Sequence, residues 1–279
     1  MSHLEITHQN KAPTLFNRDG TSYQTYGASG HSLIFIHGVG MCADIWEPQV
    51  EYFAEKFQVL TYDLLGHGQT QLNNNLPQLN DYVEQLNNLV NSLNISKFFL
   101  VGHSMGAIIS IAYSLKYPGK ILSLIPLNIV FNRTKKARND VLKRAESILN
   151  SKKILNIDQT LVRWFKNKTS SEDLIKIDKV TNILKNASPK GYGEAYRIFA
   201  LSDKIFINNL SEIQVPVLYL TGSEDLNSTA LMSDQMSKKT PGSLSKSIKG
   251  EAHMMAYISG HKVNPIIEQF FINTQNNTQ

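Results

Sequence analysis

A serine lies at the centre of the sequence Gly102-His103-Ser104-Met105-Gly106, between two apolar runs. Residues 98–101 before it have the composition of a buried strand, and residues 107–112 after it have that of a helix. A serine on a sharp turn from strand to helix sits on strained backbone with its hydroxyl exposed. The flanking glycines are needed because strand and helix backbones pass close to such a turn. The pattern predicts nucleophilic catalysis by Ser104.

A serine hydroxyl becomes a good nucleophile when a base removes its proton, and that base is usually a histidine held by a carboxylate. Two late segments supply both groups. A predicted strand at 215–220 leads into Asp225, and another at 244–248 leads into His253. Parallel sheets bind ligands at the edge where their strands end, which is also where Ser104 is expected. We therefore predict Asp225 as the acid and His253 as the base.

Other residues of catalytic types have competing or structural interpretations. Glu224 is the alternative acid, although neighbouring side chains point in different directions, so only one of Glu224 and Asp225 is expected to serve. The only cysteine, Cys42, has no partner motif around it and is interpreted as structural. His37 and His67 follow predicted strands and are expected to hold loops in place.

Attack on a carbonyl also requires donors for the oxyanion that forms. The backbone N–H of Met105, directly after the serine, is one candidate. The other is the N–H of Val39 in His37-Gly38-Val39-Gly40, which follows a predicted strand at 32–36. Flanking glycines allow this loop to turn toward the serine, whereas the same four residues could also form a simple tight turn. We predict an oxyanion hole made by Val39 and Met105.

Strands and helices alternate along most of the chain, which predicts parallel strands joined by crossover helices. The predicted strands are short and apolar, as expected for a sheet covered on both faces. An Asp-Gly pair at 19–20 predicts an initial hairpin between 14–17 and 21–26. The further strands are predicted at 32–36, 58–62, 97–101, 121–127, 215–220 and 244–248, and the helices near 46–55, 81–93, 105–116, 228–239 and 263–273.

This alternation stops between residues 132 and 210, where the sequence is basic, helical in pattern and without a clear strand. We interpret 132–210 as a helical cap inserted after the sixth strand, with 1–131 and 211–279 forming the core domain. Additional helices that only pack on the core are the alternative. The insertion accounts for the long separation between Ser104 and Asp225.

Taken together, the motifs make the chain similar to proteins of the α/β-hydrolase fold from about residue 14 to 273. The resemblance rests on 37–40, on Asp63-Leu64-Leu65-Gly66-His67-Gly68, on 102–106, on 222–225 and on Ala252-His253. Within this superfamily the chain resembles small bacterial hydrolases with a cap, such as enol-lactonases, carboxylesterases and C–C bond hydrolases. Members often have proline at the position of Leu65 and after the catalytic acid, where this chain has other residues.

The resemblance implies a serine hydrolase that cleaves an ester, a lactone or a related acyl bond through an acyl-enzyme. Hydrolysis of C–C bonds, acyl transfer, and a receptor role with slow turnover use the same residues and remain alternatives. Apolar residues would shape the acyl pocket. Trp46, Trp164 and Met254 are candidates, and each could equally pack in the core.

Composition limits the other classes of function. The chain has 279 residues, a net charge of +5 and one cysteine, and its N-terminus lacks the pattern of a secretory signal. We expect a cytoplasmic enzyme with a small-molecule substrate, no nucleic-acid or membrane partner, no metal and no cofactor, and make no prediction of oligomeric state. A basic cluster at 133–144 could attract anionic substrates, although such runs more often form a solvated helix face.

Overall fold

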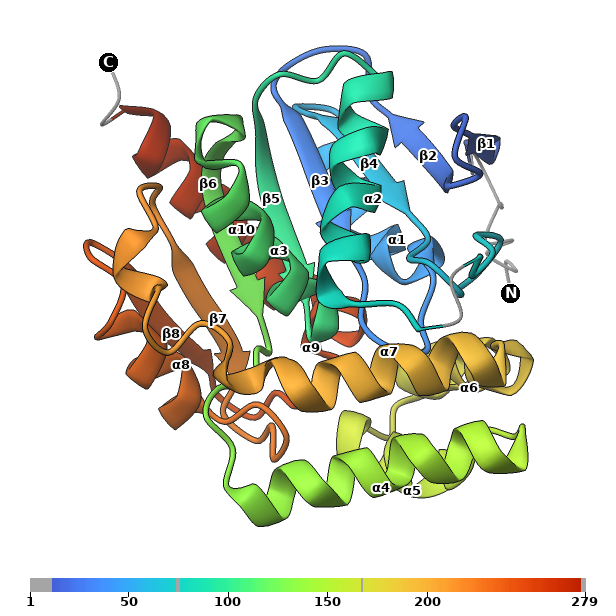
Figure 1. The fold of residues 1–279 in the computed structure, drawn as a ribbon. Helices are drawn as coiled ribbons and strands as arrows, with labels where there is room; N and C mark the ends of the chain where they lie inside the picture. Colours follow the sequence, from blue (N-terminus) through green and yellow to red (C-terminus); the bar gives the residue numbers. More distant parts are fainter. Residues whose placement is uncertain (1–11, 74–75, 167, 277–279) are drawn as a thin grey trace, which may run out of the picture.

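The computed structural model describes residues 12–73, 76–166 and 168–276, with an eight-stranded sheet at its centre (Figure 1). The strand order is β1-β2-β4-β3-β5-β6-β7-β8; β1–β2 and β2–β4 pair antiparallel, and all other neighbours pair parallel. This confirms the predicted α/β class. The strands are β1 (Leu15–Phe16), β2 (Ser22–Tyr26), β3 (Ser32–Ile36), β4 (Gln58–Tyr62), β5 (Phe98–His103), β6 (Ile121–Leu127), β7 (Leu218–Gly222) and β8 (Leu244–Ile248).

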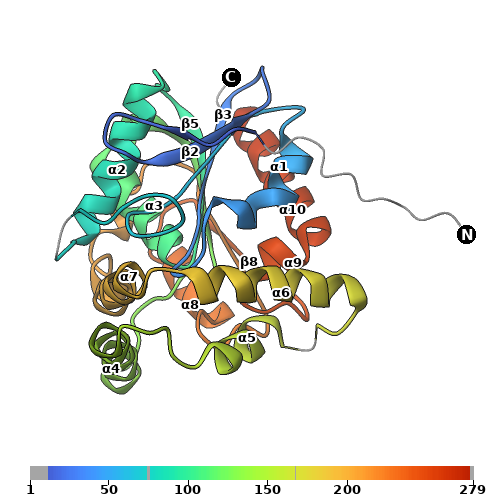
Figure 2. The same ribbon diagram turned by 90° about the vertical axis from the view of Figure 1, so that its right-hand side faces the viewer.

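Helices cover both faces of the sheet (Figure 2). On one face lie α2 (Leu79–Ser92) and α3 (Met105–Lys116), and on the other lie α1 (Glu47–Phe53) and α10 (Gly260–Asn276). All six residues of β5 are consequently buried, which explains why this strand is almost wholly apolar. Near the carboxyl ends of the last strands, α8 (Ala230–Ser237) follows β7 and the short α9 (Met255–Ile258) follows β8.

The seventh strand begins later than the sequence predicts. The apolar run starts at Val215, but β7 extends from Leu218 to Gly222. Pro216 has no N–H to donate to a ladder, and its carbonyl accepts a single hydrogen bond from Leu124 at 2.9 Å before regular pairing starts. The strand therefore ends closer to Asp225 than predicted.

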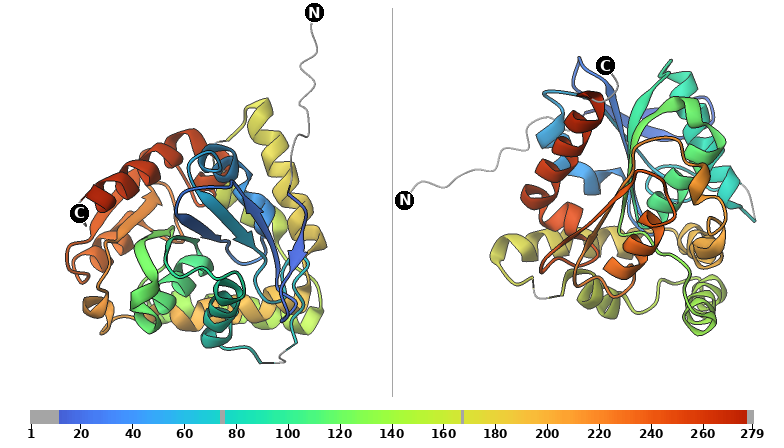
Figure 3. Two further views of the ribbon diagram at one scale, coloured as in Figure 1. Left: turned by 90° about the horizontal axis from the view of Figure 1, so that it is seen from above. Right: turned by 90° about the vertical axis from the view of Figure 1, so that its left-hand side faces the viewer.

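Within the described residues four α-helices lie between β6 and β7 in the sequence, and we refer to them as the inserted helices: α4 (Lys135–Ser151), α5 (Ile157–Phe165), α6 (Ser171–Asn186) and α7 (Pro189–Leu201). They lie at the edge of the sheet where the parallel strands end (Figures 1 and 3). Side-chain oxygens of Thr134, Ser170 and Ser188 cap the N-termini of α4, α6 and α7, so this segment carries its own helix-start signals.

The boundaries of the predicted cap, 132 and 210, enclose all four inserted helices, and its assignment as a separate domain stays a prediction. Residues 1–11 of the predicted core domain, including the N-terminal segment used to exclude a signal peptide, lie outside the described residues. Among the helices that the structure does describe, none combines the length and apolar character needed to cross a membrane.

Candidate active site

Ser104 occupies the turn between β5 and α3 with φ 56° and ψ −112°, in a region that L-residues rarely adopt. The neighbouring glycines make this turn possible. A Cβ at Gly102 would lie 2.2 Å from the carbonyl oxygen of Gly106, and a Cβ at Gly106 would lie 2.3 Å from that of Ile36. Any larger residue would push the strand and helix apart, as the sequence pattern implied.

His253 and Asp225 form a buried pair. The Nδ1 atom of His253, on the loop after β8, lies 2.7 Å from Oδ2 of Asp225, on the loop after β7. The same Oδ2 accepts a hydrogen bond from Nδ2 of Asn128 at 2.8 Å. The Oδ1 atom accepts from the backbone N–H groups of Asn227 at 2.8 Å and Ser228 at 3.1 Å. Four donors therefore fix the orientation of this carboxylate.

These contacts determine the charge of Asp225. Burial alone would raise its pKa, but the attraction of His253 and the hydrogen bonds from His253, Asn128 and Ser228 outweigh that effect and lower the pKa below its usual value. The carboxylate is thus ionised at neutral pH and can hold a proton on Nδ1 of His253. The Nε2 atom of that tautomer is then an acceptor.

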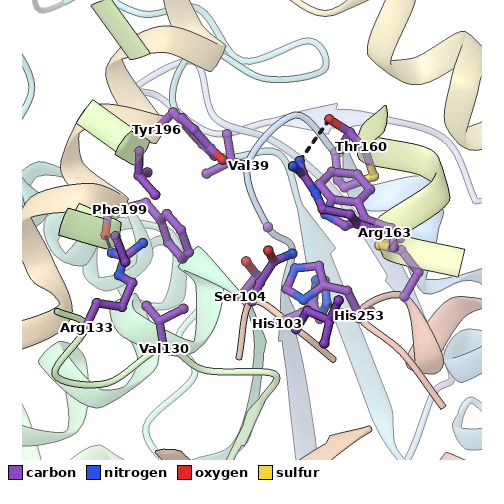
Figure 4. Close-up of a pocket in the computed structure, with 18 of the residues that line it drawn as sticks. Val39, His103, Ser104, Val130, Arg133, Thr160, Arg163, Tyr196, Phe199 and His253 are labelled. Carbon is purple, nitrogen blue, oxygen red and sulfur yellow. Dashed lines mark hydrogen bonds between the residues drawn. The ribbon is translucent and has the colours of Figure 1, made fainter. Parts of the chain in front are cut away.

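Ser104 and His253 both line a cavity of about 190 Å³ between the sheet edge and the inserted helices (Figure 4). The ring of His253 is packed between two others, with centroids at 4.8 Å for His103 and 5.7 Å for Trp164. The Nε2 atom of His103 donates to the carbonyl oxygen of His253 at 2.8 Å. Burial, with a smaller effect of His253, lowers the pKa of His103 to about 3, so it acts as a neutral support for the His253 loop.

The two predicted oxyanion donors come from the residue directly after the serine and from a loop that approaches it. Met105 is the first residue of α3, where an N–H has no partner within the helix. Val39 lines the cavity, and within the described ranges its backbone N–H has no hydrogen-bond partner. The Val39 loop approaches the serine closely, since a Cβ on Gly38 would lie 3.1 Å from Cβ of Ser104.

His37 connects this loop to the next one. Its Nδ1 donates to the carbonyl of Gly38 at 2.8 Å, and its Nε2 accepts from the backbone N–H of Leu64 at 3.0 Å. The ring of His67 lies 5.3 Å away, and its Nδ1 lies 3.0 Å from the carbonyl oxygen of Leu65. Both side chains bind loop backbone, the role that the sequence suggested.

Of the predicted substrate-binding residues, the structure places Trp164 and Met254 in the cavity wall and Trp46 elsewhere. Trp46 is fully buried and packs against Phe35 with ring centroids 4.8 Å apart, so it is a core residue. Glu224, the alternative acid, uses its backbone N–H to bond to the carbonyl of Glu251 at 2.9 Å. It is Asp225 whose carboxylate accepts the hydrogen bond from Nδ1 of His253.

Several polar residues of the site escaped sequence analysis. Asn128, which binds Asp225, follows β6 and carries no recognisable motif. Arg133, Thr160 and Arg163 line the cavity, and only Arg133 belongs to the basic cluster noted above. Within the described residues, no His, Cys, Asp and Glu side chains are grouped in threes in a way that could hold a metal ion.

Comparison with known proteins agrees with this architecture. The model of the α/β hydrolase fold family matches residues 31–258. The chain is 36% identical over 254 residues to (E)-2-((N-methylformamido)methylene)succinate hydrolase of Acinetobacter baylyi, covering 91% of this chain and 95% of that protein. It is 27% identical over 195 residues to 3-oxoadipate enol-lactonase 1 of the same organism, covering 70% and 71%.

The fold is also that of a thermophilic esterase from Thermogutta terrifontis, with a TM-score of 0.84 at 20% identity over 95% of this chain and 99% of that structure. A family match across most of the chain, together with similarity to named hydrolases over nearly its full length, supports an enzyme with hydrolase activity. The chain belongs to the α/β hydrolase fold family.

Proposed function

We propose that this hydrolase cleaves an ester, lactone or related acyl bond of a small molecule, with Ser104 as nucleophile, His253 as base and Asp225 as the acid that orients the base. The observation that carries the proposal is the 2.7 Å contact between His253 and Asp225 beside a cavity that Ser104 also lines. The names of the relatives, which include an enol-lactonase and a hydrolase of a succinate derivative, support this class of substrate.

The reaction would proceed in two halves. His253 accepts the proton of Ser104 through Nε2 while the serine oxygen attacks the acyl carbon, and Asp225 stabilises the imidazolium that forms. The N–H groups of Val39 and Met105 hold the oxyanion, and such a donor is typically worth about 3 kcal/mol in the transition state. His253 then protonates the leaving group, which leaves an acyl-enzyme. In the second half, His253 accepts a proton from water as the water attacks the acyl carbon, and it returns a proton to Ser104 as the acid is released.

The size and cover of the cavity support a small substrate. Its volume of about 190 Å³ is below the ~300–1,000 Å³ of sites for drug-sized ligands. We propose that the inserted helices, within residues 132–210, act as a cap that contributes most of the wall opposite Ser104. Trp164 and Met254 lie against His253 and would contact the acyl group, whereas Trp46 has no place in this pocket.

Labelling with a fluorophosphonate probe tests the proposal most directly, because the oxygen of an activated serine displaces fluoride from the probe and becomes phosphonylated without needing the natural substrate. We expect wild type to be labelled and to hydrolyse short p-nitrophenyl esters, and Ser104→Ala to lose both. Ser110→Ala is a matched control, since Ser110 is buried on α3 and its hydroxyl donates to the carbonyl of Ala107 in its own helix. Turnover retained in Ser104→Ala would contradict the nucleophile assignment.

A further inference from the structure

Two arginines of the inserted helices converge on one hydroxyl group beside the cavity. Nη2 of Arg144, on α4, donates to Oγ1 of Thr160 at 2.5 Å, and Nη2 of Arg163, on α5, donates to the same oxygen at 3.4 Å. Thr160 in turn donates to the carbonyl of Asn156 at 2.9 Å. Figure 4 shows Thr160 and Arg163 together in the cavity wall.

The charges of these two arginines are not neutralised within the described residues. Among residues 12–73, 76–166 and 168–276, no carboxylate lies within ion-pair distance of Arg144 or Arg163, and the Nε atom of each is buried without a hydrogen-bond partner there. Two guanidinium groups that share one neutral hydroxyl repel each other. Such an arrangement is costly unless an anion completes it.

A second pair of arginines nearby shows the contrasting arrangement. Arg133 and Arg138 share the buried carboxylate of Asp203, with Nε–O distances of 3.6 Å and 2.8 Å. Nη2 of Arg133 also donates to the carbonyl of Phe199 at 2.6 Å. Although Arg133 lines the cavity, its charge is already balanced by the carboxylate of Asp203, so Arg163 is the better candidate for contact with a ligand.

The cavity itself is electropositive. Among the described residues that line it, the charged side chains are the two arginines Arg133 and Arg163, with no aspartate or glutamate. Burial and the neighbouring Tyr196 raise the pKa of the lining residue Tyr192, whereas Arg144 and Arg163 act to lower it. A neutral acyl substrate would leave the positive charge of Arg163 without a counter-ion.

We propose that Arg163, supported by Arg144 through Thr160, binds a free carboxylate of the substrate, so that the enzyme acts on the acyl bond of a short dicarboxylic acid derivative. A guanidinium matches a carboxylate in shape and charge and can bind it through two parallel hydrogen bonds. The small cavity limits the carboxylate to a position a few bonds from the scissile carbonyl. Arg163 would touch the substrate, whereas Arg144 is a positioning residue. This inference rests on the proposed function, because it takes Ser104 to attack that carbonyl.

Paired substrates isolate the contribution of the charge. Monomethyl succinate and methyl levulinate have nearly the same shape, but only the former carries a carboxylate in place of a methyl ketone. We expect wild type to prefer monomethyl succinate by about 10- to 100-fold in kcat/KM, the size of a hydrogen-bonded charge contact. Arg163→Gln should bring this ratio close to one, and Arg163→Lys should retain part of it. Arg18→Gln removes the same charge from an exposed hairpin and should leave the ratio as in wild type.

Calorimetric titration with succinate separates this proposal from the proposed function. We expect succinate to bind Ser104→Ala, which cannot turn over substrate, and to bind Arg163→Gln at least tenfold more weakly than wild type. Arg163-dependent binding without hydrolysis of any ester would support the carboxylate site and contradict the hydrolase mechanism. Equal hydrolysis of both esters, with succinate binding that is indifferent to Arg163→Gln, would overturn the carboxylate site and leave the mechanism intact.

Discussion

The side-chain amide of Asn128 donates a hydrogen bond to Oδ2 of Asp225 at 2.8 Å, the same oxygen that His253 contacts at 2.7 Å. Asn128 has φ 50°, a left-handed conformation that asparagine tolerates better than most residues. This amide is thus placed to keep Asp225 ionised and turned toward the histidine. The loss of this amide should affect His253, because both side chains bind the same carboxylate oxygen.

Asn128→Asp tests this support while keeping the size and backbone preference of the side chain. A second carboxylate beside Asp225 would remove a donor and add a like charge, which raises the pKa of Asp225. We expect kcat to fall by about 10- to 100-fold and the acid limb of the pH–rate profile to move to higher pH. Asn94→Asp, at an exposed residue with φ 55°, is the matched control. An unshifted profile would show that Asn128 has only a structural role.

Asp225→Asn should lower kcat by about 10⁴-fold, as expected when a histidine loses the carboxylate that fixes its tautomer. Glu224→Gln should have little effect, because the structure pairs His253 with Asp225. Steady-state kinetics on a p-nitrophenyl ester measure kcat for both variants. A larger decrease of kcat in Glu224→Gln than in Asp225→Asn would identify Glu224 as the acid.

The serine turn makes a steric prediction. Gly106→Ala would place a methyl group 2.3 Å from the carbonyl oxygen of Ile36, so β3 and α3 must separate. We expect the free energy of unfolding to fall by about 3 kcal/mol, the upper end of the range for overpacked substitutions, because backbone atoms cannot move aside as side chains can. Gly119→Ala, where no atom lies within 4 Å of the added methyl, should change the free energy of unfolding by less than about 0.5 kcal/mol. Urea denaturation of the two variants provides the comparison.

Three buried histidines predict how stability responds to acid. Burial lowers the pKa of His37 to about 4, and burial with weaker contributions from neighbouring histidines lowers those of His67 and His103 to about 3. Below pH 6.5 the unfolded chain binds protons at these residues and the folded protein does not, so stability falls as the pH decreases. Each histidine contributes a slope of about 1.4 kcal/mol per pH unit.

Urea unfolding between pH 6.5 and 5.0 measures this slope before the carboxylates with lowered pKa values begin to titrate. We expect the full stability above pH 6.5 and a combined loss of up to about 4 kcal/mol per pH unit below it. His67→Gln should reduce the slope by about one third. A free energy of unfolding that stays constant over this range would show that these histidines titrate normally in the folded protein.

A buried carboxylate joins the inserted segment to the core. Glu251, whose side chain is fully buried, binds Lys168 at 2.9 Å and Lys262 at 2.6 Å. We expect Glu251→Gln to cost about 2 kcal/mol, less than for a wholly buried pair because both lysines reach water. Glu172→Gln breaks an exposed pair with Lys176 and should leave the free energy of unfolding almost unchanged. Equal urea midpoints for the two variants would contradict a structural role for Glu251.

The parts of the molecule that could be predicted from sequence are those set by local sterics. Gly102 indicates a tight turn because its nearest neighbour in space, Gly106, is also close in sequence, whereas the contact of Gly106 with Ile36 on β3 depends on the sheet. The parallel strands follow from apolar runs and their crossover helices. The expected site residues Ser104, Asp225 and His253 follow the ends of such strands, and the structure places them beside one cavity or in its wall.

Features that depend on tertiary register could not be predicted. Asn128 meets Asp225, 97 residues later, only because β6 and β7 are neighbours in the sheet. Within the basic cluster at 133–144, the lysines and the arginines have different environments, which composition cannot show. Its lysines are exposed, whereas Arg133 is buried with Asp203 and Arg144 turns toward Thr160.

The inserted helices leave the sheet from β6 and return to it through β7, and Leu127 and Leu220 of these strands are paired in register. The two ends of the insertion are therefore held side by side by the sheet itself. The entropy of closing such an excursion grows only with the logarithm of its length. A segment of different length between the same two strands should therefore cost little additional entropy of closure, and we expect its replacement to leave the pairing of β6 and β7 intact.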